Sequence, residues 1–180
     1  MRGRCTQRIS LRPFLPRQAW RLSTADALMN EDEYKSAYRA INERACPFEK
    51  AILSRQCGCQ YAQRLQIADR EAAGCRSVTA PPACHELLRL LRVNAQFALG
   101  MAASPGALPH GKEMKVQVGG LLGLQQLLAE AADMRAVENV YGLVRAAKKI
   151  HGELESLPFF QIVRSIASYR GRRRTRSRKH

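Results

Sequence analysis

The sequence predicts an all-α protein, an irregular bundle of about six to seven helices with disordered basic N- and C-terminal tails. Apolar residues recur at the helical period of 3.6 along most of the chain between Glu31 and Tyr169. No stretch shows the sustained alternation, bounded by turn signals, that indicates a half-buried strand. A chain of 180 residues can also bury one core without crosslinks. These three observations together favour a single helical domain.

The predicted helices follow one another along the chain with short connections. Asn30 and the three acidic residues after it are typical of a helix start, because the asparagine can accept hydrogen bonds from free backbone N–H groups. Gly119, Gly120 and Gly123 fall within the fifth helix, where each costs about 0.5–1 kcal/mol relative to alanine. We interpret them as a sign of close helix–helix packing, with a kink or a nearby bound group as the alternative. The expected ranges are Glu31–Arg44, Pro47–Gln56, Gln60–Ala73, Cys84–Ala102, Glu113–Ala132, Arg135–His151 and Pro158–Tyr169.

The net charge of +15 is concentrated at the two ends of the chain. Six arginines and no acid precede Asp26, and seven basic residues and no acid follow Tyr169. We therefore predict an Arg-rich leader over residues 1–28, disordered or dispensable, a helical cysteine-containing domain over 29–169 and a disordered basic tail over 170–180. Charge alone attracts phosphates, so the tail predicts a nonspecific nucleic-acid contact. The residues that would make it are Arg170, Arg172, Arg173, Arg174, Arg176, Arg178 and Lys179.

The sequence also bears on the compartment. No apolar run approaches the roughly 20 residues that cross a bilayer, and the N-terminus lacks the apolar stretch of a secretory signal. We therefore predict a cytoplasmic protein with no transmembrane segment. Residues 1–28 have the Arg, Ser and Thr content of a transit peptide, so a mitochondrial location is the alternative. Pro13 and Pro16 disfavour the helix that such a peptide forms, and a start at Met29 would remove the leader altogether.

Clustered cysteines are the strongest functional signal in the chain. Five of the six fall within 39 residues: Cys46, Cys57, Cys59, Cys75 and Cys84. In a chain without a secretory signal, such a cluster indicates a metal or iron–sulfur site, redox exchange or disulfides. We predict that these cysteines supply the ligands of an iron–sulfur cluster or zinc, with four completing the site and one left over. The natural four are Cys46, Cys57, Cys59 and either Cys75 or Cys84. Their spacing matches neither the paired C-x2-C of zinc ribbons nor the C-x2-C-x2-C of ferredoxins.

The predicted helices place three of these thiols at helix starts, namely Cys46, Cys59 and Cys84. Free backbone N–H groups and the positive end of a helix dipole lower the pKa of a thiol. We therefore expect these thiols to ionise readily. Gly58 is expected to let the chain turn sharply between two of the cysteines, and His85 is a substitute ligand.

The function that follows is an intracellular metal-binding protein with an accessory or redox-sensing role and a protein partner. We expect a binding protein rather than an enzyme, and name no catalytic residues, because no Ser–His–Asp set, H-E-x-x-H helix or carboxylate pair stands out. One alternative is a nucleic-acid-associated or adaptor protein with structural cysteines and a basic tail. Another is a disulfide-stapled helical protein of an oxidising compartment. Its cysteine-flanked helices would loosely resemble the twin C-x9-C proteins of the mitochondrial intermembrane space, although the spacings here are ten and eight.

Overall fold

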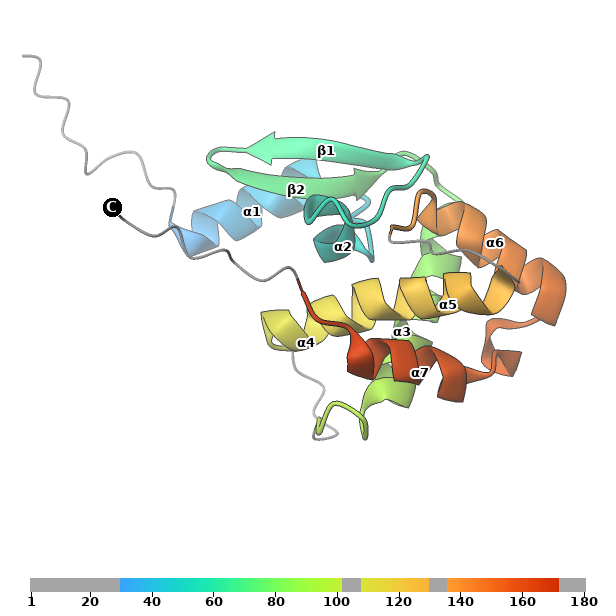
Figure 1. Ribbon diagram of the computed structural model, residues 1–180. Coiled ribbons are helices and arrows are strands. Elements are labelled where there is room, and N and C mark those ends of the chain that lie inside the picture. Colours follow the sequence, from blue (N-terminus) through green and yellow to red (C-terminus); the bar gives the residue numbers. More distant parts are fainter. Residues whose placement is uncertain (1–29, 102–107, 130–135, 172–180) are drawn as a thin grey trace, which may run out of the picture.

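A computed structural model describes residues 30–101, 108–129 and 136–171. These residues form six helices and one small two-stranded antiparallel hairpin. The hairpin lies on one side of the molecule beside two helices, α1 and α2, and the remaining helices form a bundle on the other side (Figure 1). The prediction of a mostly helical protein is confirmed, whereas the prediction that it contains no strands is wrong. The leader and most of the basic tail lie outside the described residues.

Six of the seven predicted helices have a counterpart in the structure. A continuous helix over 110–128 is composed of α4, a π-helical turn η1 and α5. A short 3-10 turn, η2, connects α6 to α7. None of the helices in the described residues is both long and apolar enough to span a membrane. The elements are α1 (Glu31–Ile41), α2 (Glu49–Leu53), β1 (Ala62–Ile67), β2 (Arg70–Cys75), α3 (Ala80–Ala95), α4 (His110–Met114), η1 (Lys115–Gly119), α5 (Gly120–Leu128), α6 (Val140–His151), η2 (Leu154–Ser156) and α7 (Phe159–Ser168).

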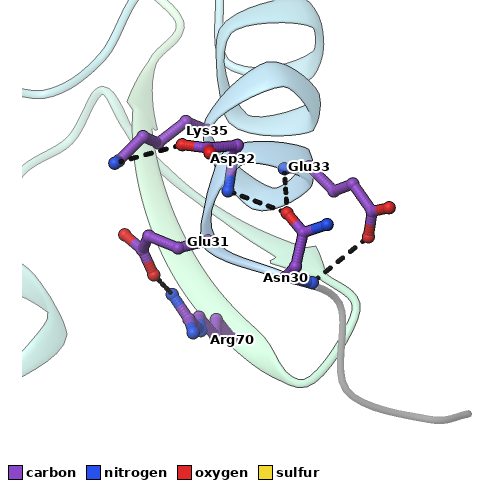
Figure 2. Close-up of polar contacts among 6 residues, drawn as sticks. All are labelled: Asn30, Glu31, Asp32, Glu33, Lys35 and Arg70. Carbon is purple, nitrogen blue, oxygen red and sulfur yellow. Dashed lines mark hydrogen bonds and ion pairs between the residues drawn. The ribbon is translucent and has the colours of Figure 1, made fainter.

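The predicted start of the first helix is confirmed (Figure 2). Asn30 Oδ1 accepts hydrogen bonds from the backbone N–H groups of Asp32 at 3.0 Å and Glu33 at 2.9 Å. The Glu33 carboxylate accepts in return from the Asn30 N–H at 3.2 Å, so two free donors are satisfied reciprocally. Glu31 also pairs with Arg70 Nη1 at 2.8 Å. Since α1 buries none of its residues, this pair is one of the contacts that attach it to the hairpin.

The predicted helix over Gln60–Ala73 is wrong, because these residues form most of the hairpin. Ala62 lies opposite Cys75 and Ile67 opposite Arg70 in the antiparallel register. Contacts from outside the segment hold β2 on the edge that faces away from β1. There the Ala73 N–H donates to Glu49 Oε1 at 3.1 Å, and Ala45 forms a bridge with Gly74. Such tertiary contacts outweigh the helical preference of the local sequence.

The three glycines of the fifth predicted helix lie where other helices approach most closely. A Cβ on Gly119 would lie 2.9 Å from Ile166 Cα in α7, and one on Gly120 would lie 2.8 Å from Leu91 Cδ1 in α3. A Cβ on Gly123 would meet the α7 backbone at 3.0 and 3.1 Å. The interpretation of these glycines as a sign of close packing is therefore confirmed.

Candidate metal centre

Two of the predicted ligands are brought together because residues 44–46 pair with β2 on the edge that faces away from β1. Cys46 N–H donates to the Ala73 carbonyl at 2.9 Å, and Cys75 N–H donates to the Arg44 carbonyl at 2.7 Å. Between these bonds, Ala45 forms an antiparallel bridge with Gly74. Cys46 and Cys75 therefore come from adjacent extended segments, although they are far apart in the sequence.

The next two cysteines reach the same end of the hairpin by short connections. The Cys59 carbonyl accepts from the Ala62 N–H at 3.0 Å, which holds Cys59 just ahead of β1. Cys84 lies in α3, which begins at Ala80, five residues after β2 ends at Cys75. Its side chain is buried, with 7% of the residue exposed. Four separate segments thus deliver one cysteine each.

The thiols of Cys46, Cys59, Cys75 and Cys84 lie close enough for their charges to interact. Burial raises the pKa of Cys46 to about 12, and charge on Cys59 or Cys75 acts in the same direction. Burial also raises the pKa of Cys84 to about 12, again with contributions from the other three thiols. The structure therefore gathers four of the five predicted ligands in one neighbourhood.

The gathered thiols do not form a ready site for a single ion. Within the described residues, no three Cys, His, Asp or Glu side chains are placed so that they could hold a metal ion. The five cysteines of this part of the chain are all free thiols. Four sulfurs in a tetrahedron about zinc, with Zn–S bonds of about 2.3 Å, lie about 3.8 Å apart. The four thiols are thus neighbours, but not arranged around one point of that size.

Cys57 is separate from the other four. Burial raises its pKa to about 12, partly offset by a hydrogen bond from the Val137 backbone N–H, and no other cysteine contributes. Its charge acts instead on Tyr169, which follows α7. Gly58 N–H donates to the Val137 carbonyl at 2.7 Å, and a Cβ on this glycine would lie 2.6 Å from the Glu138 carbonyl oxygen. Gly58 therefore permits a close backbone contact that holds Cys57 toward the helical bundle.

The expectation that helix starts would make the thiols ionise readily is wrong for Cys46 and Cys84. Cys46 does accept a hydrogen bond from the Phe48 N–H ahead of α2, which lowers its pKa, but burial has the larger effect. Cys84 lies beyond the first turn of α3. Cys59 precedes a strand rather than a helix. Desolvation of the charged thiolate therefore decides the outcome at both buried positions.

The structure also reveals a buried polar network beside Cys46 that the sequence analysis missed. Glu113 is 2% exposed, and its Oε1 accepts hydrogen bonds from Arg92 Nη2 and Gln117 Nε2, each at 2.7 Å. Gln117 also accepts from the Ala51 N–H at 3.1 Å and donates to the Pro47 carbonyl at 3.3 Å. The network thereby supports the turn that carries Cys46. Only the four-residue spacing of Glu113 and Gln117 in a predicted helix could have pointed to it.

The other candidate residues are exposed or lie outside the described part of the chain. His85 is exposed on α3, next to Cys84. Arg170 is exposed, and the rest of the predicted nucleic-acid-binding set, from Arg172 to Lys179, lies outside the described residues. Comparison of the chain with protein-family models, with curated proteins and with solved structures finds no match.

Proposed function

We propose that this protein holds an iron–sulfur cluster on Cys46, Cys59, Cys75 and Cys84. One observation carries the proposal: four separate segments bring Cys46, Cys59, Cys75 and Cys84 toward one end of the hairpin, whereas the contact of Gly58 holds Cys57 toward the bundle. Four cysteine thiolates are the usual ligand set of both [2Fe–2S] and [4Fe–4S] clusters. Cys57, which the sequence places among the natural ligands, is then the fifth cysteine and not a ligand.

The spacing of the thiols favours a cluster over zinc. A zinc ion needs all four sulfurs within one small tetrahedron. A cubane cluster instead bonds each cysteine to a different iron, so its four ligand sulfurs lie farther apart. Neighbouring thiols, of which no three in the described residues are placed for one ion, are compatible with this larger group. Zinc is the second candidate, because each sulfur can move by rotation about the Cα–Cβ bond.

The partial solvent exposure of the cysteines supports a redox role. Cys46, Cys59 and Cys75 are half-buried, and only Cys84 of the four is fully buried. A cluster on these residues would lie near the surface, where it could exchange electrons with a partner protein. The Phe48 N–H that donates to the Cys46 sulfur is a contact of the kind that tunes cluster potentials. We therefore propose a redox-sensing or accessory protein rather than one that turns over a substrate.

The test is cluster loading in a matched series of alanine variants. The full chain, purified and reconstituted without oxygen, should absorb near ~400 nm and contain iron and acid-labile sulfide. We expect Cys46→Ala, Cys59→Ala, Cys75→Ala and Cys84→Ala each to lose most of this absorbance. Cys57→Ala is the control, since it also removes a buried thiol, and it should keep the full iron content.

Three results would contradict the proposal in different ways. A colourless protein with one equivalent of zinc would replace the cluster by a single ion. Equal loss of iron in Cys57→Ala and the other four variants would contradict the claim that Cys57 is not a ligand. A mass deficit of about 2 Da per bond under non-reducing conditions would instead indicate disulfides.

A further inference from the structure

A cleft of about 790 Å³ lies beside Cys46, between α2, α3 and α4. This volume is within the range of roughly 300–1,000 Å³ that is typical of small-molecule sites. Such sites combine an apolar wall with a few polar groups that orient the ligand. Basic side chains come from Lys50 on α2 and from Arg89 and Arg92 on α3. The apolar wall contains Pro47, Pro82, Leu88, Val93, Met101 and Leu108.

Two of the three carboxylates of the cleft are fully engaged by protein groups. The two oxygens of Glu86 accept hydrogen bonds from Arg89 Nε at 3.2 Å and Arg89 Nη2 at 2.6 Å. The two oxygens of Glu49 accept from the Tyr38 hydroxyl at 2.6 Å and from the Ala73 N–H at 3.1 Å. Each oxygen of these two carboxylates therefore already has a donor from the protein.

The third carboxylate, Glu113, is buried and holds the side chain of Arg92 in place. Its Oε1 binds Arg92 Nη2, and its Oε2 is shut away from solvent without a hydrogen-bond partner among the described residues. The glutamate side chain is 3% exposed, whereas the side chain of Arg92 is 47% exposed. Arg92 is thus anchored at one nitrogen while the rest of its guanidinium reaches the open side.

Apart from the enclosed Glu113 Oε2, each carboxylate oxygen of the cleft has a protein donor, whereas two of its cations keep unused N–H groups. Lys50 makes no side-chain hydrogen bond or ion pair with any residue that the structure describes, and Arg92 has N–H groups left over. A planar guanidinium and an ammonium suit carboxylate or phosphate oxygens. We propose that this cleft binds a small organic anion, with its acidic group at Lys50 and Arg92 and its apolar body on the wall formed by Leu88 and Val93.

This inference stands apart from the proposed cluster. The two sites share only Cys46, which lines the cleft. Binding of an anion can therefore be measured whether or not the protein carries a metal, and its failure would leave the cluster proposal untouched.

Three probes with the same eight-carbon body and different head groups test the proposal: octanoate, octan-1-ol and octylammonium. In ligand-observed NMR titrations of the full chain, we expect octanoate to bind most tightly and octylammonium least. Lys50→Gln should lower the affinity for octanoate by up to about fivefold, as expected for the loss of one partly exposed charge. Its affinity for octan-1-ol should not change. Arg145→Gln is the control, because Arg145 is an exposed cation on α6 outside the cleft.

Several outcomes would overturn the assignment. Octylammonium binding as tightly as octanoate would show that the buried Glu113 carboxylate, rather than the cations, sets the preference. Equal weakening of octanoate by Lys50→Gln and Arg145→Gln would indicate a general charge effect. Absence of binding by all three probes at millimolar concentration would exclude a site with an apolar wall. Since Lys50 makes no contact that folding needs, unchanged circular dichroism of its variant is expected.

Discussion

The hairpin side and the bundle side of the molecule are stabilised by different interactions. In the bundle, the fully buried side chains are large and apolar, and burial of each contributes roughly 1.5–3 kcal/mol. In the hairpin, the buried positions of β2 are Ala72, Ala73 and Gly74, and Ile67 is the one large side chain buried from β1. The bundle core includes Leu87, Leu91, Leu121, Leu124, Val144, Ile162 and Ile166.

This difference shows what the proposed cluster would contribute to the fold. A two-stranded hairpin with so little apolar burial is at best marginally stable by itself. Here it is supported by backbone hydrogen bonds to residues 44–46 and by the contacts of α2 with β2. A metal group that joined the four thiols would tie the turn before α2, both strands and α3 together. The region that is weakest in packing is therefore the one that would gain most from a crosslink.

If the protein binds the proposed cluster, the largest expected effect is on local opening of the hairpin when that cluster is removed. Amide hydrogen exchange should become more than about tenfold faster in β1 and β2, because a bound metal group contributes its binding energy to folding. Exchange in α5 and α7 should stay nearly unchanged, since their packing contains none of the four thiols. Equal acceleration in both regions would show that the hairpin and the bundle open as one unit.

A smaller effect is expected when the bundle is disturbed instead. Gly123→Ala would place a Cβ about 3 Å from the α7 backbone, which cannot yield as a flexible side chain can. We expect a loss of about 1–3 kcal/mol in the free energy of unfolding, measured with urea. Cluster absorbance per mole of folded protein should not change.

Gly111→Ala is the matched control for this substitution. Gly111 lies in α4 with no atom within 4 Å of a Cβ placed there, so alanine should be neutral or slightly stabilising. Equal destabilisation by the two substitutions would mean that close packing against α7 is not what requires glycine at position 123.

The bundle could be predicted from the sequence because its information is local. Each of its helices has its own 3.6-residue period, and the glycines indicate close packing before any partner is known. The hairpin could not be predicted in this way. Residues 60–73 contain Leu65, Ala68 and Ala72 at helical spacing. They form strands by pairing with each other through a turn at Ala68 and Asp69, which lacks the Asn-Gly or Asp-Gly signal of a tight hairpin. The contacts that hold β2 from outside come from Glu49 and residues 44–46, which no window over the hairpin contains.

The sequence predicts that the cysteines are the candidate ligands, but it does not predict that Cys57 lies apart from the other four. Cys57 and Cys59 are two residues apart and look equivalent in the sequence. What separates them is the contact of Gly58 with Val137 and Glu138, from a segment far along the chain. The cleft was missed for a related reason, since a buried charge such as Glu113 is indistinguishable from a solvated one until its partners are in place.

The two regions should also respond differently to alkaline pH. Burial raises the pKa of Cys57 to about 12 from an ordinary value of 9.0. Between these values the folded protein keeps a proton that the unfolded chain releases. The stabilising contribution of this thiol is therefore complete below pH 9 and decreases by about 1.4 kcal/mol per pH unit above it. For the proposed ligands Cys46 and Cys84, the same loss applies only while they carry no metal, because metal ligation removes their protons.

Comparison of the metal-free protein with its Cys57→Ala variant isolates this effect, because the other thiols contribute equally to both. Between pH 9.5 and 10.5, the free energy of unfolding of the unsubstituted chain should fall by about 1.2 kcal/mol more than that of the variant. If the difference in free energy of unfolding between the two proteins is the same at pH 9.5 and pH 10.5, Cys57 ionises as easily in the folded protein as in the unfolded chain. The thiol would then be open to solvent, and the buried contact with Val137 that separates it from the four ligands would be absent.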